Sequence, residues 1–219
     1  MDALLARQYN IGVGISLGNK WFTPENIYGL TEWALEYTKD KTVIYTADTI
    51  HALNIEARDR TTPKRAQEMA RSQTDKLISA VKVLIENSMT SEQRAKIDYA
   101  NWDDVETSVF KHKVEYLYKQ YKTNYEFRTA IRLVVVAHIN KEERHFSEVA
   151  VEKMARYILE ELPEIVASTE IKGVTYQAYV YPFDNHLAVL VEQIQKSEVF
   201  LEIGKHLLDA PARAFLEVR

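Results

Sequence analysis

A single serine, Ser16, lies in the apolar run I-G-V-G-I-S-L-G-N at residues 11–19, between Gly14 and Gly18. A serine hydroxyl at the end of a strand can serve as a nucleophile once it is activated, but a small residue there also simply lets the chain turn. The run lacks the third glycine of the G-x-G-x-x-G dinucleotide fingerprint and the G-x-S-x-G elbow of many hydrolases. Taken alone, Ser16 therefore favours a structural role.

Two further polar residues, Tyr157 and Glu161, are four positions apart, which predicts neighbouring places on one helix face. We expect that helix to run from Ser147 to Leu162 and to end at Pro163, with the pair in its last turn. Surface helices often carry such pairs, so the spacing alone indicates no chemistry. The six histidines show no metal-binding spacing, and the absence of cysteine excludes thiolate ligands and nucleophiles.

Residues 63–86 predict a long helix, called the basic helix here, with cations on one side and apolar residues on the other. At about 100° per residue, the cations fall close to one line. They are Lys64, Arg65, Arg71, Lys76 and Lys82. Glu68 and Asp75 interrupt this arc, and a solvated surface helix is the more common meaning of such a pattern. The alternative is a track for nucleic-acid phosphates on a protein whose net charge is −4.

The elements that would position these residues begin with a strand at Ile11–Ile15, a helix that starts at Pro24, and a second strand at Thr42–Thr46. Strand, helix and strand with short connections indicate a parallel sheet, and ligands usually bind beyond the carboxyl ends of its strands. Ser16 and Asp48 would both lie at those ends.

The rest of the chain is predicted to be mostly helical from Thr49 to about His138, with a strand at Val174–Tyr181 and a helix at Asp184–Lys196. The last twenty residues predict a short amphipathic piece. One α/β domain fits the length of 219 residues and the 46% hydrophobic content. Because no apolar run is long enough for a membrane helix or a signal peptide, we expect a cytoplasmic protein without a membrane partner.

Four separated segments resemble, in their order and spacing, those of the cyclodipeptide synthases. They are G-I-S-L-G-N at 14–19, the stretch 47–77, Y-I-L-E-E-L-P at 157–163 and Y-P-F-D at 181–184. The resemblance implies a single Rossmann-like domain over residues 1–219 with a central, mainly parallel sheet and many surrounding helices, related to class Ic aminoacyl-tRNA synthetases. It also implies an aminoacyltransferase that joins amino acids from two aminoacyl-tRNAs into a 2,5-diketopiperazine, without ATP, metal or another cofactor.

The resemblance also implies a role for each matching side chain. Ser16 would carry first the aminoacyl group and then the dipeptide. Tyr157 and Glu161 would hold the amino group of the bound residue. Tyr181 would relay a proton during cyclisation, Asn19 would orient the dipeptidyl group, and the cations of the basic helix would bind the tRNA backbone.

The pocket for the first amino acid would involve Gly14, Glu164 and Tyr179. An unpaired carboxylate there would suit a polar or cationic side chain, for example histidine, better than an aliphatic one. Asn19 suits one branch of the family and Pro182 the other, so the subfamily stays open.

Two interpretations from other classes stay open as well. A serine hydrolase would share Ser16 but needs a histidine base, for which His138 and His186 are the candidates. A non-catalytic tRNA-binding module would keep the basic helix and would have no use for Ser16, Tyr157 or Glu161.

Overall fold

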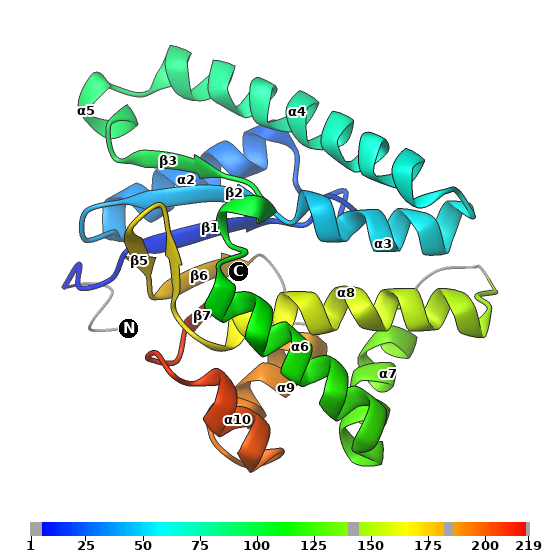
Figure 1. Ribbon diagram of the computed structural model, residues 1–219. Helices are drawn as coiled ribbons and strands as arrows, with labels where there is room; N and C mark the ends of the chain where they lie inside the picture. Colours follow the sequence, from blue (N-terminus) through cyan, green and yellow to red (C-terminus); the bar gives the residue numbers. More distant parts are fainter. Residues whose placement is uncertain (1–5, 140–144, 182–185, 218–219) are drawn as a thin grey trace.

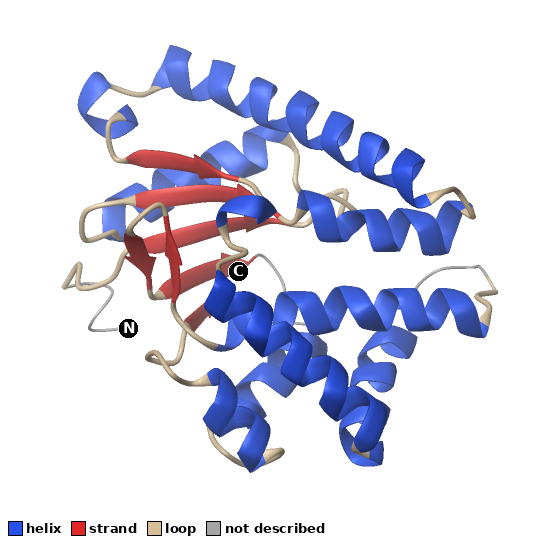
Figure 2. Cartoon of the chain, in the orientation of Figure 1, coloured by secondary structure: helices blue, strands red, loops and turns tan. Residues whose placement is uncertain are grey.

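A parallel sheet lies at the centre of the computed structural model, which describes residues 6–139, 145–181 and 186–217. Five described strands form this sheet in the order β3-β2-β1-β6-β7, and helices cover both of its faces (Figures 1 and 2). The strands are β1 (Ile11–Ile15), β2 (Thr42–Thr46), β3 (Ile97–Ala100), β6 (Ala178–Tyr181) and β7 (Ala214–Glu217), with a separate antiparallel hairpin of β4 (Thr169–Ile171) and β5 (Val174–Tyr176). The helices are α2 (Pro24–Tyr37), α3 (Asp48–Asp59), α4 (Pro63–Ser88), α5 (Ser91–Arg94), the 3₁₀ helix η1 (Trp102–Asp104), α6 (Ser108–Thr123), α7 (Tyr125–Ile139), α8 (Glu148–Val166), α9 (His186–Gln195) and α10 (Leu201–Leu207).

The first strand–helix–strand unit confirms the predicted bounds of β1 and β2 and the predicted start of α2. Every residue of both strands is buried, as expected for parallel strands covered on both faces. The hydroxyl of Thr23 accepts a hydrogen bond from the backbone N–H of Asn26 at 3.3 Å, and Pro24 occupies the first helical position, where its missing N–H is not needed.

Three parts of the chain differ from the prediction. The stretch expected to be helical contains the short strand β3, because its four residues pair with β2 along the sheet. The expected strand at residues 174–181 divides between the hairpin and the sheet. The last residues include β7, which pairs with β6.

Helix α8 also continues through Pro163 to Val166 instead of ending at the proline. Proline in a helix removes one backbone hydrogen bond and crowds the carbonyl group four residues earlier, but the buried side chains of Leu162, Ile165 and Val166 hold that turn against the core. Tyr157 and Glu161 therefore lie within the helix and not in its last turn.

The order of the strands reverses between β1 and β6. The chain first builds β1, β2 and β3 towards one edge and then returns to add β6 and β7 on the other side of β1. In such sheets the crevice outside the carboxyl ends of the strands at the reversal is the usual binding site. Ser16 follows β1 and Tyr181 is the last residue of β6, so the fold brings both backbones to this crevice.

Residues alternate between the two faces of the sheet. Ile15 and Ile44 pack with Val81 and Ile85 of α4 on one face, which α2 and α4 cover. Gly14 lies on the opposite face, under the ring of Tyr179. Below that face in Figure 1, a second apolar cluster joins α6, α7, α8, α9 and α10.

Candidate active site

Ser16 is half-buried at the start of the loop from β1 to α2. The backbone N–H of Asn19 donates to the carbonyl oxygen of Ser16 at 3.1 Å, and the side-chain Oδ1 of Asn19 accepts from the backbone N–H of Trp21 at 3.0 Å. The carboxamide of Asn19 therefore helps to fix the shape of the loop that presents Ser16.

Helix α3 closes one side of this loop. A Cβ at Gly18 would lie 3.2 Å from Cε1 of His51 and 3.3 Å from Nη1 of Arg58, so the loop packs directly on both side chains. Burial, together with the charge of Arg58, lowers the pKa of His51 to about 4, which keeps its imidazole neutral at pH 7. His51 was not predicted from the sequence, because a lone histidine on a helix carries no pattern that separates it from a core residue.

Of the two histidines considered as hydrolase bases, one is linked to the serine loop through Arg58. His138 is near the end of α7, and its Nε2 is 2.8 Å from Nη2 of Arg58. Because a guanidinium only donates hydrogen bonds, this nitrogen must act as the acceptor. His186 is exposed at the start of α9. In the described part of the chain, neither histidine hydrogen-bonds to Ser16.

Tyr157 and Glu161 form a pair within α8, with the Tyr157 hydroxyl donating to Oε1 of Glu161 at 3.0 Å. The ring of Tyr157 packs against the cluster that contains Tyr45 and Tyr179, on the face of the sheet where Gly14 lies. Burial and the nearby charge of Glu164 raise the pKa of Glu161 to about 8, against the opposing effect of the hydrogen bond from Tyr157. A carboxyl with this pKa exchanges a proton near neutral pH.

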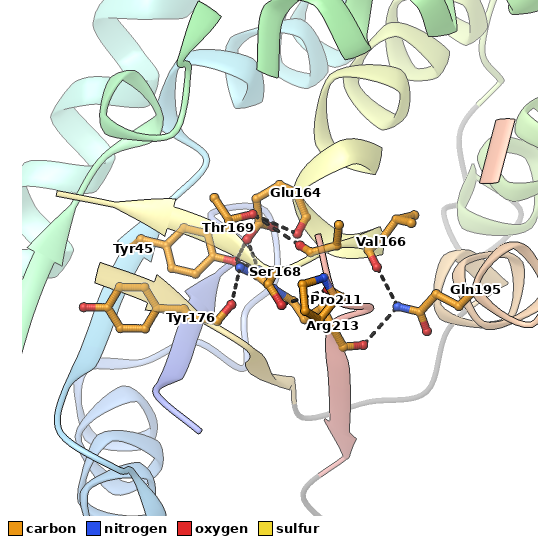
Figure 3. Close-up of polar contacts among 10 residues, drawn as sticks. Tyr45, Glu164, Val166, Ser168, Thr169, Tyr176, Gln195, Pro211 and Arg213 are labelled. Carbon is orange, nitrogen blue, oxygen red and sulfur yellow. Dashed lines mark hydrogen bonds and ion pairs between the residues drawn. The ribbon is translucent and has the colours of Figure 1, made fainter. Parts of the chain in front are cut away.

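Glu164 is paired in the structure, contrary to the expected unpaired carboxylate. It is 1% exposed and forms an ion pair with Arg213, which is 2% exposed (Figure 3). The hydroxyl of Tyr45 donates to the same carboxylate at 2.7 Å, and Nη2 of Arg213 donates to the carbonyl oxygen of Tyr176 at 3.3 Å. The charge argument for a cationic substrate therefore loses its basis, because Arg213 already neutralises Glu164.

The backbone around Arg213 is held in place from two sides. Gln195 of α9 donates through Nε2 to the carbonyl oxygens of Val166 at 2.8 Å and of Arg213 at 2.9 Å, and the hydroxyl of Ser168 donates to that of Pro211 at 2.8 Å (Figure 3). Arg213 was not predicted from the sequence. Its only local signal is a single arginine between two alanines, and its partner lies 49 positions away.

Tyr179 occupies the space above Gly14. A Cβ at Gly14 would lie 2.0 Å from the hydroxyl oxygen of Tyr179 and 2.3 Å from two of its ring carbons. Only glycine fits under the ring in this position, and Tyr179 itself is 5% exposed. The predicted pocket residues Gly14, Glu164 and Tyr179 thus lie close together, joined through Tyr45, which is the register partner of Gly14.

The five predicted cations of the basic helix are all exposed on α4, which runs along the top of the molecule in Figure 1. Arg65 pairs with Glu68 at 3.3 Å, and the ammonium of Lys82 lies 4.6 Å from the ring centroid of Tyr99. Lys64, Arg71 and Lys76 have no ion-pair partner among the described residues. This face therefore offers positive charge to a ligand.

One predicted side chain cannot be placed. The backbone of Tyr181 ends β6, whereas its side chain, like the whole of Pro182, lies outside the described part of the chain. Over the described ranges, no group of three or more histidine, aspartate or glutamate side chains could hold a metal ion, and no helix is long and apolar enough to cross a bilayer.

Comparisons with known proteins agree with the resemblance. A family model described as cyclodipeptide synthase matches residues 2–205. A comparison with curated protein sequences finds no match.

Solved structures of cyclodipeptide synthases share the fold at low sequence identity. The enzyme from Bacillus thermoamylovorans has a TM-score of 0.71 at 17% identity, over 91% of this chain and 86% of that one. AlbC from Streptomyces noursei has a TM-score of 0.67 at 19% identity, over 96% and 95%. The synthase from Candidatus Glomeribacter gigasporarum, solved bound to Phe-tRNAPhe, has a TM-score of 0.61 at 14% identity, over 96% and 88%. The chain therefore belongs to the cyclodipeptide synthase family, whose members are aminoacyltransferases that use aminoacyl-tRNAs, and no ATP, to make cyclic dipeptides.

Proposed function

We propose that this chain joins two aminoacyl groups through a covalent intermediate on Ser16 and releases them as a 2,5-diketopiperazine. In the first step the Ser16 hydroxyl attacks the ester carbonyl carbon of one aminoacyl-tRNA. The bond to the terminal ribose oxygen breaks, and that oxygen takes up the serine proton. The products are free tRNA and an aminoacyl ester of Ser16, formed with less base assistance than an amide would need because the substrate is already an activated ester.

Glu161 and Tyr157 hold the α-amino group of the bound residue. An α-amino group has a pKa of about 7.7–8.0 in peptides, close to the value of about 8 to which burial and Glu164 raise the pKa of Glu161. Because the two pKa values match, Glu161 can accept the proton that the amine must lose before it becomes a nucleophile.

The second and third steps use the same carbonyl chemistry. The amine on Ser16 attacks the ester carbonyl of the second aminoacyl-tRNA, whose ribose oxygen leaves with a proton, and a dipeptidyl ester of Ser16 forms. The new terminal amine then attacks the carbonyl at Ser16. The bond to the serine oxygen breaks, Tyr181 relays the amine proton to that oxygen, and Asn19 orients the dipeptidyl group during closure of the ring.

One observation carries the proposal. The hydrogen-bonded pair of Tyr157 and Glu161 packs on the face of the sheet where Gly14 lies, beside the strand end from which Ser16 emerges. Since side chains alternate along a strand, position 16 continues the face of position 14. The arrangement supports a nucleophile and an amine-binding pair that share one crevice, which the tRNA-binding module and the hydrolase do not require.

The exposed cations of the basic helix would form the surface that binds tRNA. Lys64, Arg65, Arg71, Lys76 and Lys82 would bind the phosphates of each aminoacyl-tRNA in turn. The first amino acid would be polar, with histidine as the case to test, because the hydroxyls of Tyr45 and Tyr179 and the ion pair of Glu164 place polar groups on the face of the sheet where Gly14 lies.

The test is transfer of label from charged tRNA to the protein. The chain is mixed with tRNA carrying a radiolabelled amino acid, quenched in acid and analysed by intact-protein mass spectrometry and product chromatography. Each amino acid is supplied in turn, which also tests the preference for histidine. We expect an ester adduct in the wild type and in Ser108→Ala, an exposed serine on α6, and none in Ser16→Ala. Label that persists in Ser16→Ala would refute the covalent mechanism.

A further inference from the structure

A polar pocket lies under the basic helix, on the face of the sheet opposite Gly14. It has a volume of about 270 Å³ and lies between α4 and the carboxyl ends of β2 and β3. This volume is slightly below that of most small-molecule sites, about 300–1,000 Å³, and suits one ring system better than a whole nucleotide.

Two hydroxyls that line this pocket have no partner. Thr46 is fully buried and Thr74 is 8% exposed, and among the described residues neither Oγ1 has a hydrogen-bond partner. A buried hydroxyl without a partner is unfavourable by roughly 1–3 kcal/mol. Two of them on residues that line one pocket favour a ligand whose hydrogen-bonding groups complete the site.

The charges of the pocket exclude a phosphate as that ligand. Lys82 and Lys172 line it together with Asp75 and Asp104, so two cations are balanced by two carboxylates. Lys172 is itself paired with Asp104 at 3.2 Å. A neutral group with donors and acceptors on its edge fits this balance, whereas an anion would meet both carboxylates.

The pocket also has an aromatic wall. The ring of Tyr99 lines the pocket, and the ammonium of Lys82 covers it at 4.6 Å from the ring centroid. Lys82 is also the last cation of the basic helix. A phosphate that draws Lys82 outward would uncover the ring, and stacking on such rings is a common way for proteins to hold an unpaired base.

The pocket is also close to the nucleophile. Thr46 is the register partner of Ile15, the residue before Ser16. Neighbouring strands are about 4.8 Å apart, so the floor of the pocket and the serine loop lie one strand spacing apart, on opposite faces of the same sheet edge. A tRNA whose acyl group reaches Ser16 brings its last unpaired nucleotides to this edge.

We infer that the pocket formed by Thr46, Thr74 and Tyr99 binds one unpaired nucleobase of the 3′ end of the tRNA, while the basic helix binds the phosphates. This inference rests on the proposed use of aminoacyl-tRNA. Stacking on Tyr99 and hydrogen bonds from the two hydroxyls hold the base, and Lys82 moves from the ring to the adjacent phosphate.

The test compares two kinds of RNA on threonine-to-valine variants. The probe is deacylated tRNAPhe, labelled in its anticodon loop, either intact or with an abasic ribose at one of its unpaired 3′ nucleotides in turn. Thr46→Val and Thr74→Val remove the hydroxyls at nearly constant volume. Thr42→Val is the matched control, because the Thr42 hydroxyl on the same strand is also buried without a partner among the described residues but does not line the pocket.

We expect each pocket variant to weaken binding of intact tRNA by about 3- to 10-fold, the value of one hydrogen bond, with a melting temperature at or above that of the wild type because an unpartnered buried hydroxyl has been removed. One abasic RNA should bind wild type and variants alike, and Thr42→Val should bind like wild type. Equal weakening for every RNA, or no weakening at all, would overturn the pocket assignment. Failure of the tRNA proposal gives a different result: the double variant Lys64→Glu with Arg71→Glu would then bind intact tRNA as tightly as the wild type does.

Discussion

Removing Arg213 should leave a buried carboxylate without its counter-charge. The pair of Glu164 and Arg213 is 1% and 2% exposed, and breaking a buried pair from one side lowers the free energy of unfolding by about 3–5 kcal/mol. For a domain of this length, about 2–4 °C is lost per kcal/mol. Arg213→Met should therefore lower the melting temperature by about 6–20 °C.

The double variant separates the lost charge from lost packing. In Glu164→Leu with Arg213→Met neither member of this buried ion pair remains, and such replacements are often close to neutral. The hydroxyl of Tyr45 then lacks its acceptor, which is unfavourable by about 1–3 kcal/mol, so adding Tyr45→Phe should recover further stability. Thermal melts and urea titrations measure the cycle, with Lys196→Met in an exposed pair as a control that should leave the melting temperature unchanged.

The reasoning is refuted if Arg213→Met melts within about 2 °C of wild type, or if the double variant is less stable than Arg213→Met. The same variants are needed to test which amino acid the pocket accepts. Glu164→Leu alone leaves Arg213 buried and unpaired, so its product spectrum would mix a change of pocket with a loss of fold. Products should be compared between wild type and the double variant, in which a shift towards aliphatic first residues is expected.

Three further perturbations have expected outcomes. Glu161 has its pKa raised from 4.5 to about 8, so its protonated form favours the folded state: that stability is complete below about pH 4.5 and is lost as the pH rises through 8, with a slope of up to about 1.4 kcal/mol per pH unit. Glu161→Gln should flatten this part of a urea-unfolding profile, and an unchanged profile would contradict the cause given. Gly14→Ala should lower stability by about 1–3 kcal/mol because its Cβ meets Tyr179, and Tyr179→Leu should restore it in thermal melts. Lys64→Glu with Arg71→Glu should weaken tRNA binding and reduce the slope of log affinity against log salt, whereas Lys205→Glu on α10 should not; an equal effect of both would argue against a dedicated face.

The sequence predicted the parts of the fold that have a local cause. Apolar runs bounded by turns defined β1 and β2, and a capping threonine before Pro24 defined the start of α2. The short strands β3 and β7 have no such signal, because they are strands only through pairing with β2 and β6. Helix α8 passes Pro163 because tertiary packing outweighs one lost hydrogen bond.

The residues of the candidate site also divide into those that could be predicted from the sequence and those that could not. Ser16, Tyr157 and Glu161 were predicted as site residues only through the resemblance to a family, since no local pattern set them apart from ordinary residues. The ion pair of Glu164 and Arg213 was not predictable, because it joins positions that come together only in the folded chain. The unpartnered hydroxyls of Thr46 and Thr74 were missed for the same reason: a threonine shows its lack of a partner only in three dimensions.

The pairing of β1 with β6 has a consequence for biosynthesis. Ile11 is in register with Ala178, so one wall of the crevice is made near the beginning of the chain and the other much later. Contacts between such distant segments form slowly, because a long loop must close first. A chain emerging from the ribosome would thus expose the serine loop and α4 before β6 exists, and the crevice would stay open on one side until the second half of the chain has been made.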